Sequence, residues 1–296
     1  MTQKIGEHGF LVVDKEPGMT SHDVVAIARR ALGTRKVGHA GTLDPMATGV
    51  LVLGFNNGTR LLQYITDGDK SYQATVVLGV STVTDDFEGE VIATVDASAI
   101  TDEQINAELD TMRGTFMQRP SSVSAVKVDG ERAYDRVRSG ETVVLASREV
   151  TISQLDILEI RRIEKRVEID IEVTCSAGTY IRAIARDCGD TLKVGGHLSA
   201  LRRTRVAGFT TSGSASIADL KSAEFSTLDL ADVARATFPV REIALDEKLE
   251  LSFGRTLAAN PADGIYAGVS PANELIALLS NVDGKAKPIA VFAAAH

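Results

Sequence analysis

Residues 39–51 read HAGTLDPMATGVL, a loop with one carboxylate, Asp44, that runs directly into an apolar strand. Gly41 and Gly49 permit tight backbone turns, and Pro45 fixes its own φ and biases Asp44 towards an extended conformation. The loop is therefore stiffened around one acid, which makes Asp44 a candidate nucleophile or base. An Asp-Pro turn that only leads into a buried strand is the common structural alternative.

Outward from this loop, strand and helix patterns follow one another irregularly. Strands are expected at residues 9–15, 50–55, 70–80, 121–128, 148–159 and 166–175, and helices at 20–32, 101–113, 131–139, 180–192 and 217–236. Capping boxes, in which a hydroxyl is followed three residues later by an acid or amide, mark helix starts at Thr20 and Thr101. Strands interrupted by helices without regular βαβ alternation indicate an α+β fold with a mixed, largely antiparallel sheet flanked by helices.

The composition changes near residue 210. Residues 210–216 read TTSGSAS, small and polar, and short β-like runs separated by Gly, Pro and Asn follow from Val240 onwards. Such short runs are typical of a small barrel-like β domain. We therefore predict a main domain over residues 1–236 and a small β domain over residues 237–296.

Charge is distributed unevenly along the 296 residues, whose net charge is −8. Three basic windows contain no acid: residues 24–43, 111–128 and 191–218. These windows could converge on one face and contact phosphates, although solvated helix faces would leave the same pattern.

The remaining composition points to a cytoplasmic protein. No apolar run is long enough to span a bilayer, and the first seven residues lack the apolar core of a signal peptide. The two cysteines, Cys175 and Cys188, have no metal-ligand spacing and form no disulfide framework. We expect no metal site, and a monomer, because no association motif is present.

Three further motifs carry groups that could serve a site. Tyr72, in a predicted strand, offers a ring face for stacking and a phenolic hydroxyl, but an ordinary strand aromatic is the alternative. Arg182 opens a predicted helix, where it could bind a carboxylate bidentately or lie on the surface. Residues 195–205, GGHLSALRRTR, combine a flexible hinge with arginines that suit phosphate and RNA, or form a basic surface helix.

Taken in order, these motifs resemble the TruB-type pseudouridine synthase family, the bacterial tRNA pseudouridine-55 synthases. The segments that carry the resemblance are residues 9–15, 18–21, 37–49, 70–72, 178–182 and 197–203. Several independent motifs in the right order are far more specific than any one of them. Residues 120–123 read PSSV, where family members often show a double proline and a tyrosine, so the role of residues 118–127 stays open.

The resemblance implies a pseudouridine synthase domain followed by a PUA-type RNA-binding domain. It also implies that uridine 55 in the T-loop of the tRNA T-arm is isomerised to pseudouridine without cofactor or metal. The base would be flipped out of the RNA, and its N1–C1′ bond would be replaced by a C5–C1′ bond.

The same resemblance assigns roles to individual residues. Asp44 is the essential ionised acid, and we expect Arg182 to pair with it, lower its pKa and fix its orientation. Tyr72 would stack on the uracil and help remove the C5 proton. The residues expected to bind substrate or RNA are His39, Lys15, Gly41, Leu201, Arg202 and Arg203. For His39, a purely structural histidine is the alternative.

Other functional classes fit the sequence less well. An RNA-binding or RNA-folding protein with a degenerate site would not need Asp44, Tyr72 and Arg182 together. A phosphatase would want a metal-binding acid nearby and a glycosidase a second carboxylic acid, yet residues 45–66 contain no acid. A ribosomal or guide-directed uridine is the remaining alternative target, and the covalent path of Asp44 stays open.

Overall fold

A computed structural model describes residues 6–121, 127–128, 131–132 and 145–293. The chain divides into two compact units, each built from separate stretches of sequence. The first unit comprises residues 1–44, 50–66 and 207–296, and the second comprises residues 45–49 and 67–206. The domain boundary expected after residue 236 stays a prediction.

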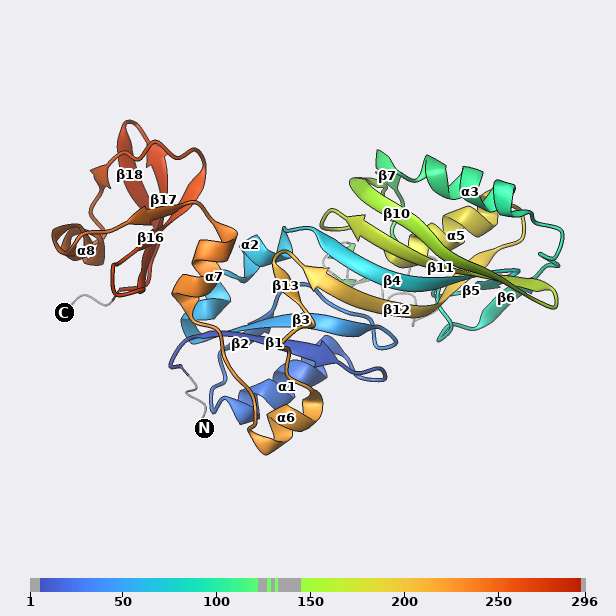
Figure 1. Cartoon of the computed structure of the whole chain (residues 1–296), viewed down its shortest axis with the longest axis horizontal. Coiled ribbons are helices and arrows are strands. Elements are labelled where there is room, and N and C mark those ends of the chain that lie inside the picture. The colour runs from blue at the N-terminus through green and yellow to red at the C-terminus, as the bar shows by residue number, and fades with distance from the viewer. Residues whose placement is uncertain (1–5, 122–126, 129–130, 133–144, 294–296) are drawn as a thin grey trace. The chain divides into compact units, whose positions relative to one another are not determined.

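The first unit contains helices and strands from both ends of the chain (Figure 1). Its N-terminal elements are β1 (Gly9–Lys15), α1 (Ser21–Ala31), β2 (Val37–His39), β3 (Thr48–Phe55, in this unit from Val50), η1 (Asn56–Arg60) and α2 (Leu62–Thr66). Its C-terminal elements are β13 (Phe209–Thr210), α6 (Ile217–Ser222), α7 (Leu230–Thr237), β14 (Val240–Glu242), α8 (Leu245–Ser252), β15 (Leu257–Ala258), β16 (Ile265–Val269), β17 (Leu275–Val282) and β18 (Lys285–Val291).

Backbone hydrogen bonds join the two ends of the chain within this unit. The Phe10 N–H donates to the Leu228 carbonyl at 2.9 Å, and the Asp14 N–H donates to the Ala215 carbonyl at 2.9 Å. Helix α1 begins with the expected capping box, in which Thr20 and Asp23 bond each other's backbone N–H groups. Figure 1 shows α1 beside α6. Residues 215–228 thus extend the N-terminal layer rather than forming a separate tail.

The C-terminal strands form a five-stranded sheet in the order β14-β16-β17-β18-β15. Its curled form, visible in Figure 1, is consistent with the expected barrel-like, PUA-type domain. Its core is built from buried apolar side chains, among them Ile243, Leu251, Tyr266 and Leu279.

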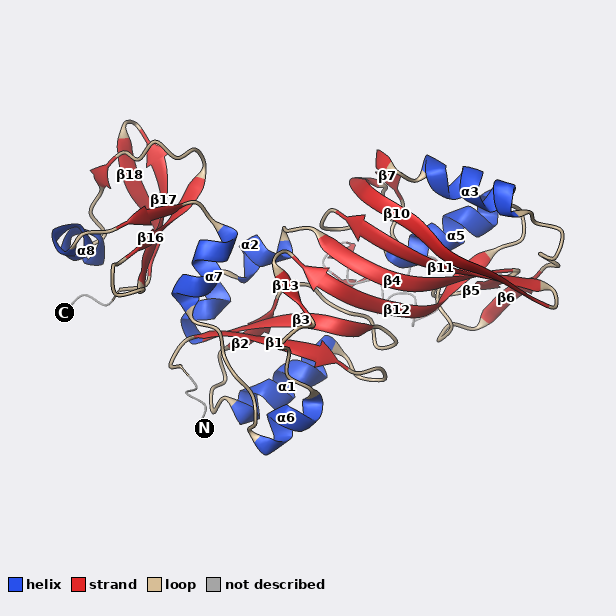
Figure 2. Cartoon of the chain, in the orientation of Figure 1, coloured by secondary structure: helices blue, strands red, loops and turns tan. Residues whose placement is uncertain are grey.

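The second unit is built around a mixed sheet with two helices on one face (Figure 2). Its elements are β4 (Lys70–Leu78), β5 (Val80–Thr82), β6 (Val91–Thr94), α3 (Asp102–Thr111), β7 (Gly114–Gln118), β8 (Lys127–Val128), β9 (Glu131–Arg132), β10 (Arg148–Ile163), β11 (Arg166–Cys175), α5 (Ile181–Thr191) and β12 (Gly196–Val206).

The strands of this sheet follow the order β12-β4-β11-β10-β7, and all of these pairs are antiparallel. On its other side, β12 pairs in parallel with the first two residues of β3. Helix α5 packs on β12 and β4, and α3 packs on α5 and β10. The prediction of an α+β fold with a mixed, largely antiparallel sheet is therefore confirmed.

Several local expectations were wrong. The alternative of a basic surface helix at residues 195–205 is excluded, because residues 196–206 form a central strand with backbone partners on both sides. The helix expected over residues 217–236 is two helices, separated where Ala223 takes a left-handed conformation. Helix α8 was not expected at all.

Two expected elements lie largely outside the described residues. Of the strand expected over residues 121–128, only Lys127–Val128 is described as strand. Of the helix expected over residues 131–139, Glu131–Arg132 is strand and the remainder falls outside the description. In the part of the chain that is described, no helix is long and apolar enough to cross a membrane.

Candidate active site

The loop that carries Asp44 is tied to the start of α1. The buried Ser21 hydroxyl accepts a hydrogen bond from the Leu43 N–H at 2.8 Å and donates to the Leu43 carbonyl at 3.2 Å. The Ala40 N–H donates to the Val52 carbonyl at 2.9 Å. Asp44 itself is half-buried. The backbone just before the acid is thus fixed at two points, and the contact with Ser21 was not foreseen from the sequence.

The end of the same loop is fixed against β12 in the second unit. Gly49 lies opposite Arg203 in the parallel ladder and has φ of +98°. A Cβ at this position would overlap the Arg203 carbonyl oxygen, so only glycine allows the close approach. Arg203 is in turn the partner of Tyr72 in the antiparallel ladder between β12 and β4. Gly49, Arg203 and Tyr72 therefore form one row across the sheet.

This row decides which predicted residues share a face. Leu201 and Arg203 are two residues apart on β12 and project from the same face as Tyr72, whereas Arg202 projects from the opposite face. Tyr72, Leu201 and Arg203 are buried, with 7%, 7% and 1% of their surface exposed. Arg202 is half-buried, and its Nη1 lies 3.4 Å from the Thr48 hydroxyl, to which it donates.

Three predicted RNA contacts belong to the first unit. Lys15 is the last residue of β1 and is fully buried, and its Nζ donates to the Glu16 carbonyl at 2.9 Å. His39 ends β2 and meets His22 edge to face, with ring centroids 5.6 Å apart. Gly41 takes a positive φ of +91°, as a tight loop requires.

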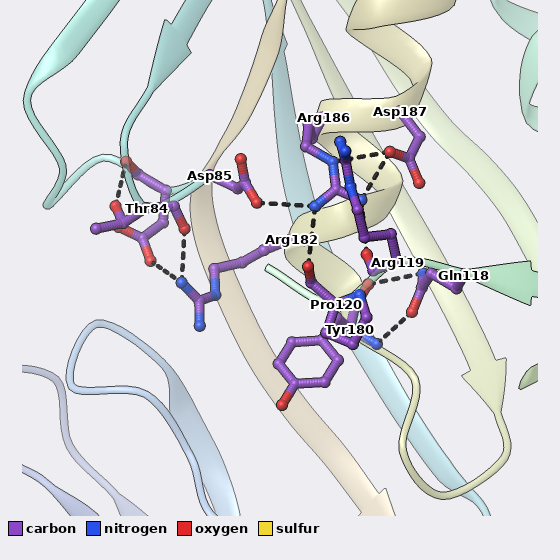
Figure 3. Close-up of polar contacts among 10 residues, drawn as sticks. Thr84, Asp85, Gln118, Arg119, Pro120, Tyr180, Arg182, Arg186 and Asp187 are labelled. Carbon is purple, nitrogen blue, oxygen red and sulfur yellow. Dashed lines mark hydrogen bonds and ion pairs between the residues drawn. The ribbon is translucent and has the colours of Figure 1, made fainter. Parts of the chain in front are cut away.

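Arg182 projects from the first turn of α5 and is buried (Figure 3). Its Nη1 donates to the Thr84 carbonyl at 2.6 Å and to Asp86 Oδ2 at 3.1 Å. The side chains of the Arg182–Asp86 ion pair are only 4% and 5% exposed. The expected pairing of Arg182 with Asp44 stays a prediction.

Asp86 is held as firmly as the arginine it binds. Its Oδ1 accepts hydrogen bonds from the Thr84 hydroxyl at 2.5 Å and from the Glu88 N–H at 3.1 Å. The loop is also joined to β12, because the Leu198 N–H donates to the Asp85 carbonyl and the Phe87 N–H donates to the Leu198 carbonyl. Sequence reasoning treated residues 84–90 only as an acidic loop and missed this role.

A second ion pair lies beside the first. Arg186 Nη1 is 3.2 Å from Asp85 Oδ2, and both side chains are largely buried. Arg186 Nη2 also contacts Asp187 at 2.7 Å. Burial raises the pKa of Asp85, and a hydrogen bond from Ser121 and the charge of Arg186 offset part of that effect.

Tyr180, which caps α5, is positioned by two side chains. The Gln118 amide accepts from the Tyr180 N–H at 2.8 Å and donates to the Tyr180 carbonyl at 3.1 Å. The Arg148 guanidinium lies 4.8 Å from the centre of the Tyr180 ring. These contacts fix the orientation of Tyr180, which lies two residues before Arg182 in the sequence. The GTYIR motif did not reveal that Tyr180 is held in this way.

A second basic side chain is buried near the row that contains Tyr72 and Arg203. Lys70, two residues before Tyr72, is buried, and burial together with the nearby Arg203 lowers the pKa of its ammonium group. Within the described ranges, no group of three or more His, Cys, Asp or Glu residues is placed to hold a metal ion.

Three family models match successive parts of the chain. The model described as "TruB family pseudouridylate synthase (N terminal domain)" matches residues 29–181. The model described as "tRNA pseudouridylate synthase B C-terminal domain" matches residues 182–244, and "tRNA Pseudouridine synthase II, C terminal" matches residues 238–293.

Curated relatives match over almost the whole chain. A protein of Arthrobacter sp. (strain FB24) named "tRNA pseudouridine synthase B" is 52% identical, with 96% of each chain covered. A protein of the same name from Corynebacterium efficiens is 50% identical, covering 98% of this chain and 97% of its own.

Solved structures show the same fold at lower identity. A chain from "Structure of H/ACA RNP bound to a substrate RNA containing 2'-deoxyuridine" has a TM-score of 0.71 and 23% identity, covering 97% of this chain and 86% of its own. A chain from "Crystal Structure of a Cbf5-Nop10-Gar1 Complex" has a TM-score of 0.71 and 24% identity, covering 97% and 85%.

Proposed function

This chain belongs to the TruB family of pseudouridylate synthases, and we propose from that premise that it converts uridine 55 in the T-loop of tRNA into pseudouridine. Relatives named tRNA pseudouridine synthase B share about half of its residues over nearly their whole length, and the chain is therefore a tRNA pseudouridine synthase, an isomerase. The choice of uridine 55 and the roles of individual residues are the proposal.

The reaction rearranges one nucleoside without oxidation or hydrolysis. The N1–C1′ bond breaks, the uracil rotates, a C5–C1′ bond forms, and the proton on C5 is lost while N1 gains one. The enzyme must supply an ionised acid, a site that excludes water and groups that hold the detached uracil.

Asp44 is the acid in this proposal, and the main support for this assignment is the position of Gly49 opposite Arg203. Pro45–Gly49 belong to the second unit, and Gly49 lies in the row that contains Arg203 and Tyr72. Asp44 directly precedes this segment. Its backbone is also fixed by the bonds between Ser21 and Leu43, so the carboxylate is carried on a rigid loop.

Arg182 keeps the Asp44 carboxylate ionised and oriented in this proposal. A carboxylate taken out of water tends to take up a proton, and an adjacent guanidinium opposes this by lowering its pKa. A guanidinium has five N–H donors in a planar fork, so it can bind two carboxylates at once. Its contacts with Thr84 and Asp86 support the role, because they fix the orientation of the arginine.

Tyr72 and Leu201 hold the flipped uracil. Both are buried, and they project from the same face of the sheet on neighbouring strands. Extruding the base from folded RNA costs a few kcal/mol, which stacking on Tyr72 helps to offset. The phenolic hydroxyl is available to assist loss of the C5 proton.

The proposed partner is the T-arm of tRNA. The residues assigned to it are His39, Lys15, Gly41, Arg202 and Arg203. Arginine-rich segments suit phosphate and RNA, and Arg202 on its half-buried face supports this assignment best. We propose that the enzyme works in the cytoplasm as a monomer, with neither cofactor nor metal.

Incubation with unmodified tRNA, and separately with an isolated T-arm hairpin, tests the function. Chemical mapping should place pseudouridine at position 55 of both, and Asp44→Asn should abolish the conversion while tRNA is still bound. Conversion by Asp44→Asn at the normal rate would refute the role of Asp44.

Arg182→Met should slow single-turnover conversion, and an unchanged rate would remove the role proposed for Arg182. Binding of tRNA by the unaltered protein without any change in the nucleoside would instead indicate an RNA-binding protein.

A further inference from the structure

Asp85 and Arg186 form an ion pair (Figure 3) one helical turn further along α5 than the ion pair of Asp86 and Arg182. Arg186 is four residues after Arg182 and so lies on the same face of the helix. The aspartates are consecutive in the loop between β5 and β6. The side chains of Arg186 and Asp85 are 12% and 11% exposed, so water screens this pair little.

Arg186 joins three segments that are distant in sequence. From α5 it contacts Asp85 at 3.2 Å, and its guanidinium also donates to the Arg119 carbonyl at 2.7 Å and to the Pro120 carbonyl at 3.4 Å. Asp85 in turn connects to β12, because its carbonyl accepts from the Leu198 N–H at 3.0 Å. Arg186 therefore ties the loop of residues 84–86 to α5 and to residues 119–120.

Stability alone does not account for this pair. A buried ion pair loses about as much in desolvation as it gains from attraction, and its best-supported benefit is a unique geometry. Burial raises the pKa of Asp85 even with Arg186 beside it, so the folded state disfavours the charge on Asp85. The ion pair between Arg186 and Asp85 fixes the loop of residues 84–86. The Thr84 carbonyl and the Asp86 carboxylate of this loop accept hydrogen bonds from Arg182.

We propose that Arg186, acting through Asp85, is a positioning residue for Arg182. By holding Thr84, Asp85 and Asp86 against α5, it presents the Thr84 carbonyl and the Asp86 carboxylate to Arg182 in a single orientation. Arg186 touches no reacting atom. The inference rests on the function proposed above for Arg182.

Arg186→Gln tests the inference through the rate of the chemical step. Enzyme in excess over unmodified tRNA should convert it about 10- to 100-fold more slowly, the penalty expected when a catalytic group is displaced by about 1 Å. The Kd for tRNA should stay within about threefold of the unaltered value, because both side chains of the pair are largely buried. Arg186→Lys keeps the charge beside Asp85 and should recover part of the rate.

Arg162→Gln is the matched control. Arg162, also in the second unit, binds carboxylate and carbonyl groups as Arg186 does, namely Asp102 at 2.7 Å and the Ile100 carbonyl at 3.0 Å, but its ion pair is exposed. This variant should react at the normal rate. An equal loss of rate in both arginine variants, or no loss in Arg186→Gln, would overturn the proposal.

Hydrogen exchange gives a readout that needs no reaction. In Arg186→Gln, the Phe87 and Leu198 amides should exchange faster, because their hydrogen bonds join the loop to β12. The amide of Ile171, in β11, should keep its protection. Unchanged exchange at Phe87 and Leu198 would overturn the proposal even if the rate falls. An unaltered protein that does not convert tRNA would defeat the proposed function, while exchange would still decide whether Arg186 holds the loop.

Asp85→Asn guards against a variant that fails to fold. The substitution keeps the size of the side chain and removes a charge that burial already disfavours, so it should cost less stability than Asp86→Asn and leave the protein folded. A slower chemical step with unaltered unfolding would support the positioning role. A normal rate in this variant would overturn it, because Arg186 is proposed to act through Asp85.

Discussion

Gly49 lies directly opposite Arg203, so close that a side chain on the glycine would overlap the arginine's carbonyl oxygen. This contact ends the loop that begins with Asp44. It also sets that loop in register with Tyr72, the partner of Arg203 on the next strand. The second glycine of the loop therefore has a specific structural task, which is to allow the backbones of β3 and β12 to meet at this row.

Gly49→Ala should destabilise the enzyme and slow catalysis. The positive φ costs an L-residue about 1–2 kcal/mol, and the clash with the Arg203 backbone adds about 1–3 kcal/mol. Urea unfolding followed by circular dichroism measures the first effect, and single-turnover conversion of tRNA measures the second.

Gly114→Ala is the control for this substitution. Gly114 has a similar φ of +85°, but a Cβ there would meet no atom within 4 Å, so only the conformational cost applies. If Gly49→Ala were no more destabilising than Gly114→Ala, the close approach to Arg203 would not be what constrains this position.

Local signals in the sequence predicted the elements that depend on local interactions. The capping boxes at Thr20 and Thr101 correctly marked the starts of α1 and α3, because the bonds involved span three residues. Helix α8 escaped notice because Ala244, which precedes it, has no hydroxyl or carboxyl group to signal a cap.

Non-local partners explain what the sequence did not reveal. Asp86 and Arg182 are 96 residues apart, and Asp85 and Arg186 are 101 apart, so residues 84–90 read only as an acidic loop. Arg203 lies in a basic segment but is buried, because it projects from the same face of β12 as the buried Leu201, whereas Arg202 on the opposite face is half-buried. No local pattern could indicate either outcome.

Asp86→Asn should weaken both the fold and the reaction. The substitution leaves a buried guanidinium with one carboxylate fewer, and breaking a buried ion pair costs about 3–5 kcal/mol. Because Asp86 orients Arg182, the single-turnover rate should fall as well.

Asp170→Asn supplies the comparison for Asp86→Asn. Asp170 also binds an arginine, Arg161, and a threonine hydroxyl, that of Thr75, yet its side chain is 31% exposed. Replacing the Asp170 carboxylate should lower the free energy of unfolding by at most about 1 kcal/mol. Equal losses of stability in urea for the two variants would contradict the importance of burial at Asp86.

The two thiols should be unreactive in the folded enzyme. Burial raises the pKa of Cys175 to about 11 and that of Cys188 to about 12, so the thiolate that reacts is scarce at pH 8. Ellman's reagent should label the native protein only as fast as it unfolds, and both cysteines should react at once in guanidinium chloride. Rapid labelling of the native protein would show that one of the thiols is accessible.

The contributions of Asp85 and Asp219 to the free energy of unfolding should change in opposite directions with pH. Burial raises the pKa of Asp85 above its ordinary 3.8, so the folded state binds the proton more tightly than the unfolded state. Its contribution to stability therefore falls as pH rises from 3.8 through the raised pKa. Relative to Asp85→Asn, the unaltered enzyme should gain unfolding free energy as the pH is lowered through that range.

Asp219 reverses this dependence. Hydrogen bonds from the backbone N–H and the hydroxyl of Ser216 lower its pKa, so its stabilising effect is present above pH 3.8 and is lost as pH falls through the lowered value. Relative to Asp219→Asn, the unaltered enzyme should lose its advantage on acidification. Urea unfolding of the three proteins across this pH range measures both slopes. A common sign for the two variants would show that burial does not dominate the titration of Asp85, and that its ion pair with Arg186 stabilises the fold outright.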